Sequence, residues 1–156
     1  MTNLLHTKAY ARFFAEMTPE TLDNMKHLLA DDAVFTDPFN TLHGSDAIVA
    51  MFIHMYAVMN NPRFDILDVA ASEKAGYIKW CMTGALRSRS SVQINLTGMS
   101  EIHFNAAGMV TAHHDHWDSA HQLLAKLPAI GWFVRRMLRL FALPSGKQLG
   151  PGKGDE

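Results

Sequence analysis

Several ingredients that mark common classes of protein are scarce in this sequence. Its 156 residues include one cysteine, Cys81, so an intramolecular disulfide and a paired-thiol metal motif are both excluded. Fourteen basic against fifteen acidic side chains leave a formal net charge of -1, which supplies no basic face of the kind that nucleic acid requires. No apolar run approaches the roughly 20 residues of a membrane span. Residues 1–10 contain His6 and Lys8 in place of the continuous apolar core of a signal peptide. We therefore expect a cytoplasmic protein that does not bind nucleic acid.

Apolar side chains, by contrast, are abundant, and two types stand out. Hydrophobic residues make up 48% of the chain, an ordinary share for a globular protein, but there are ten methionines and nine phenylalanines. Methionine fills irregular spaces, so a lining rich in Met and Phe suits a pocket for an apolar ligand. A core built from adaptable side chains is the other interpretation of the same composition.

The hydrophobic periodicity predicts helices first and strands afterwards. Helical spacing indicates helices at 4–17, 19–30 and 47–60, the second of them with Thr18 as its N-cap and Pro19 as its first residue. A short strand is expected at 33–36, and a period of two predicts strands at 64–72, 76–87, 91–105 and 109–118. Helices followed by hairpin-connected strands favour an α+β fold with an antiparallel sheet.

Two of these elements indicate which side chains face the interior. In the first helix, Leu5, Ala9, Phe13 and Met17 define the predicted buried face, with Tyr10 and Phe14 alongside. In the strand at 91–105, the even-numbered residues are apolar or small and most of the odd-numbered ones are polar. The even-numbered face is therefore predicted to be the covered, concave one, and Ser100 brings the only hydroxyl to it.

We expect one domain over residues 1–143 and a loose Gly-, Pro- and Lys-rich tail at 144–156. The domain would end in a helix at 131–143, where Arg135, Arg136 and Arg139 lie among Trp132 and other apolar residues. Such a helix can pack on its own domain or on a second subunit, or lie on a membrane surface. Membrane attachment is not the expectation here, because stable attachment usually takes a second signal.

The segment from His113 to Asp118 holds the densest group of polar side chains that could carry chemistry. Strand alternation places His113, Asp115 and Trp117 on one face, so the imidazole and the carboxylate lie close enough to influence each other's protonation. A carboxylate in an apolar pocket can act as a base towards an acidic C–H, but a solvated strand end would look the same. Alternate residues face opposite ways, so we do not predict a metal site.

Asp37, which precedes Pro38 and the apolar Phe39, is a second candidate carboxylate. Aspartate in this position often caps a turn through its own backbone, and this interpretation stands beside a functional one.

The order of elements and several local strings resemble the nuclear-transport-factor-2-like superfamily, in the branch of ketosteroid isomerases and SnoaL-type polyketide cyclases. The resemblance covers about residues 10–120. It is carried by the string at 29–38 that ends in Asp37 and Pro38, by Gly44, by the string at 100–108, and by the segment 113–118. It implies a cone-shaped α+β domain in which the N-terminal helices pack on a strongly curved sheet, and a dimer built on the outer face of that sheet.

The resemblance also assigns roles to particular residues. The general base of ketosteroid isomerases falls on Asp37, whereas their two oxyanion donors fall on Phe13, which cannot donate a hydrogen bond, and on Ser100, a weaker donor than a carboxylic acid. A true steroid isomerase is therefore not expected. In the cyclase branch the acid/base aspartate corresponds to Asp115, with His113 beside it.

The leading hypothesis is an enzyme without metal or redox cofactor that transfers a proton on a small apolar carbonyl compound. Asp115 would be the acid/base, His113 its assistant and Asp37 a second carboxylate. The predicted substrate-binding residues are Tyr10, Phe13, Phe39, Met55, Met59, Trp80, Met82, Ser100 and Trp117. A non-catalytic ligand-binding or dimerisation module of the same fold is the alternative, because a fold does not fix a function. In either case we expect a homodimer.

Overall fold

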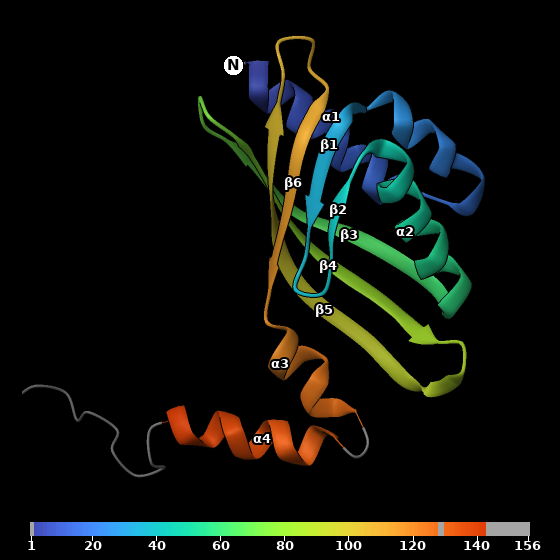
Figure 1. Cartoon of the computed structure of the whole chain (residues 1–156), viewed down its shortest axis with the longest axis vertical. Helices are drawn as coiled ribbons and strands as arrows, with labels where there is room; N and C mark the ends of the chain where they lie inside the picture. Colours follow the sequence, from blue (N-terminus) through green and yellow to red (C-terminus); the bar gives the residue numbers. More distant parts are fainter. Residues whose placement is uncertain (1, 128–129, 143–156) are drawn as a thin grey trace, which may run out of the picture. The chain divides into compact units, whose positions relative to one another are not determined.

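Six strands form the sheet that organises the first part of the molecule. The computed structural model describes residues 2–127 and 130–142. The strands are β1 (Leu29–Thr36), β2 (Thr41–His43), β3 (Met59–Ala71), β4 (Gly76–Leu86), β5 (Arg89–Phe104) and β6 (Val110–Trp117). They lie in the order β2-β1-β6-β5-β4-β3, and the sheet curves without closing (Figure 1). Neighbouring strands are antiparallel except for β1 and β6, which run parallel. The predicted α+β class and curved sheet are confirmed, although the sheet is mixed rather than purely antiparallel.

Helices cover one face of this sheet. They are α1 (Thr2–Glu16), the 3-10 helix η1 (Pro19–His27) and α2 (Ser45–Val58). Helix α1 lies against β3 and β4, and α2 lies against β1, β3 and η1 (Figure 1). The predicted start of η1 is confirmed, because the backbone N–H of Thr18 donates to the Thr21 hydroxyl at 2.9 Å and Pro19 follows at once.

The buried face of the first helix is rotated by about one position from the prediction, although Met17, Tyr10 and Phe14 are buried as expected. Leu5 is 70% exposed and Ala9 is also exposed, whereas Thr7, Tyr10 and Phe14 are buried. One residue corresponds to about 100° of rotation around a helix, so this shift moves the phenol of Tyr10 and the ring of Phe14 onto the sheet. It also turns Phe13 towards the margin of the packed face.

The alternation predicted for β5 is confirmed. Ile94, Leu96, Ser100 and Ile102 are each at most 7% exposed, while the odd-numbered residues from Gln93 to Met99 face solvent. The covered face of β5 therefore meets the helices and supplies much of the core, and Ser100 lies on it as expected.

Strand β1 is longer than the sequence indicated, and β2 was not anticipated. Leu28 and Leu29 continue the helical spacing of the preceding segment, which favoured a helix there. In the structure the backbone N–H of Val110 donates to the Leu28 carbonyl, and Leu29 pairs with Val110. Pairing with a strand some eighty residues later thus overrides the local pattern.

The chain divides into two compact units, Met1–Ser119 and Ala120–Glu156. After the four-residue helix α3 (Ser119–Gln122), the second unit contains the 3-10 helix η2 (Leu124–Lys126) and the helix α4 (Ile130–Phe141). Within that unit the guanidinium of Arg135 donates to the carbonyl of Ala125. The end of the domain at residue 143 stays a prediction, and the expected tail at 144–156 lies outside the described residues. Within the described ranges, no helix is long and apolar enough to cross a membrane.

Candidate active site

Five polar or aromatic side chains meet in the interior between α1 and the sheet. Tyr10 comes from α1, Trp80 from β4, Ser100 from β5, and His113 and Asp115 from β6. The register explains the meeting, because Ser100 is the direct cross-strand partner of Asp115, and His113 lies two residues earlier on the same face. Tyr10, Trp80, Ser100 and His113 are each at most 5% exposed.

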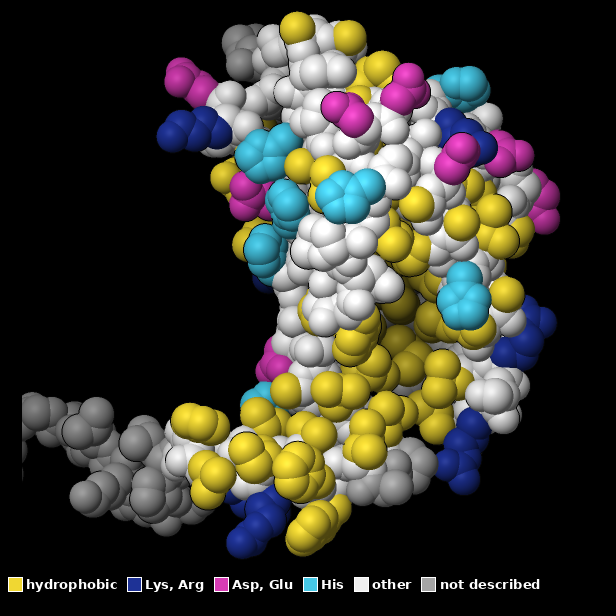
Figure 2. Space-filling view, viewed as in Figure 1, with side chains coloured by type: hydrophobic (Ala, Val, Ile, Leu, Met, Phe, Trp, Pro, Cys, Tyr) yellow, Lys and Arg dark blue, Asp and Glu magenta, His cyan; other side chains and the backbone are white. Residues whose placement is uncertain are grey.

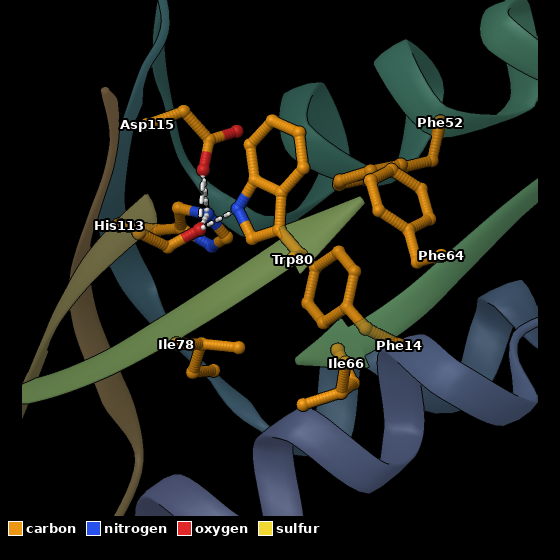
Figure 3. Close-up of a pocket in the computed structure, with 9 residues that line it drawn as sticks. Phe14, Phe52, Phe64, Ile66, Ile78, Trp80, His113 and Asp115 are labelled. Carbon is orange, nitrogen blue, oxygen red and sulfur yellow. Dashed lines mark hydrogen bonds and ion pairs between the residues drawn. The ribbon is translucent and has the colours of Figure 1, made fainter. Parts of the chain in front are cut away.

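Hydrogen bonds link these five side chains into one network. The Trp80 Nε1–H donates to Ser100 Oγ at 2.8 Å, and the Ser100 hydroxyl donates to Asp115 Oδ1 at 2.5 Å. Nε2 of His113 lies 2.8 Å from the same Oδ1 and 3.1 Å from Ser100 Oγ. The Tyr10 hydroxyl lies 3.1 Å from His113 Nδ1. Figure 3 shows Trp80, His113 and Asp115 directed towards one another, with dashed lines for the interactions of this network.

The network fixes the direction of each hydrogen bond. An indole nitrogen can only donate, so Ser100 Oγ accepts from Trp80 and gives its own hydrogen to the Asp115 carboxylate. With a carboxylate as acceptor, His113 donates through Nε2–H, and Nδ1 is then placed to accept from the Tyr10 hydroxyl. The imidazole is held between a phenol and a carboxylate.

Burial and, secondarily, the negative charge of Asp115 raise the pKa of the Tyr10 phenol above its ordinary range. Tyr10 therefore stays protonated and remains a donor to His113 at any pH at which the protein works. A phenol donor at Nδ1 favours the His113 tautomer with its hydrogen on Nε2, the atom that lies 2.8 Å from Asp115 Oδ1. Among the described residues, no donor is placed on the other carboxylate oxygen, Oδ2.

A small apolar cavity lies beside this network. Its wall consists of Phe14, Phe52, Phe64, Ile66, Ile78, Trp80, Ser100, His113 and Asp115 (Figure 3). The volume open to the centre of a water-sized sphere is about 20 Å³, which is room for about one water molecule. The rings of Phe14, Phe52 and Phe64 take up the space that a larger ligand would need, with centroid separations of 5.5 Å and 5.6 Å between Phe14 and the other two.

Asp115 also lines a second, open groove at the end of β1. The groove has a volume of about 390 Å³ and is formed with Thr36, Asp37, Pro38, His114, His116 and Trp117. The ring of Phe39 lies 5.6 Å from that of Trp117. Asp115 therefore borders both the interior cavity and the open groove.

Asp37 lies in this groove and caps a turn. Its Oδ1 accepts the backbone N–H groups of Phe39 and Asn40 at 2.7 Å and 2.6 Å, and both of its carboxylate oxygens accept from the Asn40 side chain. The turn-capping interpretation of this residue is therefore what the geometry shows, although its position in the groove places it near Asp115.

The structure brings some of the predicted site residues to the cavity and leaves others away from it. The cavity is lined by Asp115, His113, Ser100 and Trp80, and the Tyr10 hydroxyl contacts His113 without lining the cavity itself. Asp37 and Trp117 line the groove, and Phe39 is 55% exposed beside Trp117. The remaining four do not lie on the wall of either space: Phe13, Met55, Met59 and Met82.

Five apolar residues of the cavity wall were missed by sequence reasoning: Phe14, Phe52, Phe64, Ile66 and Ile78. The emphasis on methionine was misplaced for this wall, since aromatic rings and isoleucines make it. Phe14 stood beside the predicted buried face of the first helix, so the pattern marked it as core without separating cavity from core. Within the described residues, no group of three or more His, Cys, Asp or Glu side chains is arranged to hold a metal ion.

Comparison with known structures gives the fold. A putative polyketide cyclase of Xanthomonas campestris pv. campestris superposes with a TM-score of 0.64 at 14% identity, covering 77% of this chain and 93% of that one. A steroid delta-isomerase of Pseudomonas aeruginosa gives 0.57 at 17% identity, covering 90% and 93%. A Mycobacterium tuberculosis protein in complex with estradiol-17beta-hemisuccinate gives 0.59 at 16% identity, covering 75% and 94%. At such identities the likeness shows the fold alone.

The sequence comparison gives the family. No curated protein matches the chain. A family model described as a SnoaL-like domain matches residues 10–113, from the phenol of Tyr10 to the imidazole of His113. The resemblance expected from the sequence is thereby confirmed for family and fold. This match spans about two thirds of the residues of the chain, and the chain therefore belongs to the SnoaL-like domain family.

Proposed function

We propose that this protein is an acid/base enzyme of the isomerase or cyclase type that transfers a proton on a small apolar carbonyl compound. The observation that carries the proposal is the asymmetric placement of the Asp115 carboxylate. His113 and Ser100 hold Oδ1, while Oδ2 has no donor among the described residues and the side chain borders the apolar cavity. A fixed carboxylate with one uncommitted oxygen at an apolar surface is the geometry that a general base needs.

In the proposed reaction, Asp115 Oδ2 takes a proton from the carbon next to the substrate carbonyl. The electron pair of that C–H bond moves into the carbonyl and forms an enolate. When the substrate has a β,γ double bond the enolate is conjugated with it, and return of the proton to the γ-carbon shifts the double bond and completes an isomerisation, with Asp115 regenerated as the carboxylate. If the enolate carbon instead attacks a second carbonyl of the same substrate, the new alkoxide takes the proton and a ring is closed.

The other residues of the network would position this base and stabilise the enolate. Tyr10 acts through His113, so it is a positioning residue. Ser100 is the proposed donor to the substrate oxygen. When Asp115 accepts a proton its Oδ1 becomes a weaker acceptor, and the Ser100 hydroxyl can turn to the enolate oxygen while still accepting from Trp80.

The cavity supports a small and largely apolar substrate. Six of its nine lining side chains are hydrocarbon or aromatic without a charge, and the groove beside Trp117 offers an entrance to Asp115. A ring-sized ligand requires one or more of Phe14, Phe52 and Phe64 to move, because the space present holds about one water molecule. The similar structures belong to a putative polyketide cyclase and a steroid delta-isomerase, and both names fit proton transfer next to a carbonyl.

The same small volume favours the second candidate, a non-catalytic ligand-binding or dimerisation module. The hydroxyl hydrogens of Tyr10 and Ser100 are both donated within the network, so the resting protein presents no free hydroxyl donor from these two residues to a ligand. A homodimer in a cytoplasmic setting stays a prediction under either function, and sedimentation equilibrium of the full chain tests the dimer.

Proton exchange of a small ketone tests the proposal directly. The full chain is incubated with cyclopentanone in heavy water, and loss of the α-proton signal is followed by proton NMR. The variant Asp115→Asn keeps the shape of the side chain but cannot act as a base, and we expect it to lower the exchange rate at least about 100-fold. Asp23→Asn removes an exposed carboxylate from η1 and should leave the rate unchanged.

A wild-type exchange rate equal to that of Asp115→Asn would contradict the proton-transfer proposal. In that case cyclopentanone binding is measured by shifts of backbone amide signals around His113. Binding without exchange identifies the ligand-binding module. If the wild type does exchange, isomerisation of a β,γ-unsaturated cyclic ketone by the wild type and not by Asp115→Asn identifies the isomerase type.

A further inference from the structure

The helix α4 carries a stripe of exposed apolar side chains. Ile130, Phe133, Met137, Leu140 and Phe141 are between 43% and 87% exposed. At 100° per residue these five side chains fall within an arc of about 100° on one side of the helix. Hydrophobic side chains gather over this helix in Figure 2, with Lys and Arg side chains beside them. Such a run of large exposed apolar side chains marks an interaction surface.

Arginines are the only charged side chains of this helix. Arg135 and Arg139 lie opposite the apolar stripe with Trp132, which is 66% exposed, beside them, and Arg136 lies at the edge of the stripe. From Ala120 to Ala142 the sequence contains four basic residues and no acidic one, whereas residues 1–119 contain eight basic and thirteen acidic residues. The charge of the chain is therefore segregated, and one sign is concentrated in the segment that exposes the apolar stripe.

Helix α1, which also exposes one face to solvent, does not show this separation of charge. On α1 the exposed charges are of both signs, and Arg12 pairs with Glu16 at 2.9 Å. An apolar stripe on a helix whose only charged side chains are arginines is suited to the interface of an anionic bilayer.

We propose that α4 lies in the plane of an anionic lipid surface, with the stripe from Ile130 to Phe141 inserted below the headgroups. Arg136, at the edge of the stripe, then contacts lipid phosphates, and the positive charge of Arg139 adds attraction to the surface. The attachment is peripheral and reversible, because a single short helix is one signal and stable anchoring usually takes two. It would hold the sheet domain, and whatever ligand its cavity takes, beside the membrane.

Co-sedimentation with lipid vesicles tests this proposal. The full chain is mixed with vesicles of phosphatidylcholine alone or of phosphatidylcholine with about one third phosphatidylglycerol, a content that gives the anionic surface the helix requires. We expect binding to the anionic vesicles to be at least about tenfold tighter and to weaken with added salt. The double variant Arg136→Glu/Arg139→Glu should lower that binding at least about tenfold, since each basic residue near an anionic surface contributes roughly fivefold.

A matched control makes the same charge change elsewhere. Lys74→Glu/Lys79→Glu reverses two exposed lysines of the sheet domain, and its binding should stay within about twofold of wild type. Phe133→Ser/Leu140→Ser, which leaves the charges intact, should abolish binding.

Two results would overturn the proposal. One is equal or absent binding of the wild type to both kinds of vesicle. The other is that the wild type does not bind vesicles and that Phe133→Ser/Leu140→Ser changes the oligomeric state. This result would show that the stripe packs against protein. Circular dichroism of each variant shows whether the sheet domain is still folded, so loss of binding is attributable to α4.

Discussion

Removing the phenol oxygen of Tyr10 tests the internal network through protein stability. Tyr10→Phe keeps the ring, which is 2% exposed, and deletes the hydroxyl that donates to His113 Nδ1. The imidazole is itself 3% exposed, so its acceptor is left without a partner in a dry site. Leaving a buried acceptor unsatisfied costs about 1–3 kcal/mol, and we expect the variant to be less stable than wild type by this amount at pH 8.

The stability difference should shrink at high pH. Burial and the Asp115 charge raise the pKa of Tyr10 in the folded protein above its ordinary value of about 10. Above pH 10 the unfolded wild type therefore loses the phenol proton while the folded wild type keeps it. This favours unfolding by about 1.4 kcal/mol for each further pH unit. The phenylalanine variant has no such group, so the two proteins should approach equal stability near pH 11.

Urea unfolding followed by far-UV circular dichroism measures both effects. The free energies of unfolding of wild type and Tyr10→Phe are compared at intervals from pH 8 to pH 11. Ionisation of other groups affects both proteins alike and cancels in the difference. Tyr77→Phe, which removes a phenol oxygen from β4, is the matched control at pH 8, where a cost within about 0.5 kcal/mol is expected. A Tyr10→Phe deficit that stays constant from pH 8 to pH 11 would refute a buried phenol held neutral by its surroundings.

Two further substitutions probe the sheet side of the site. Ser100→Ala removes the acceptor of the buried Trp80 indole N–H and should cost about 1–3 kcal/mol in urea unfolding. Combining it with Trp80→Phe should cost less than the sum of the two single changes, and strict additivity would show that the bond contributes little. Gly98→Ala would place a methyl group 2.6 Å from the Trp80 ring and 2.9 Å from Cβ of Trp117. We expect it to cost about 1–3 kcal/mol and to alter near-UV circular dichroism, whereas a cost below about 0.5 kcal/mol would mean that the indole moves freely.

Much of the architecture could be predicted because strand alternation is a local property. The strands β3 to β6 lie within a few residues of their expected positions, apart from an earlier start of β3, and the covered face of β5 was identified correctly. The first helix was harder, because apolar residues occupy adjacent positions such as Leu4–Leu5 and Phe13–Phe14. Several faces were then compatible with helical spacing, and the sheet selected the one centred on Tyr10 and Phe14.

The sequence by itself determined that His113 and Asp115 share a face, since alternate residues of a strand project to the same side. It also indicated the family, which the match over residues 10–113 confirms. Only the tertiary structure decided what those residues meet. The β5–β6 register set Ser100 opposite Asp115, and the rotation of α1 delivered the Tyr10 phenol to His113. Those contacts join residues as many as 103 positions apart, and no local periodicity specifies the register or the helix rotation that makes them.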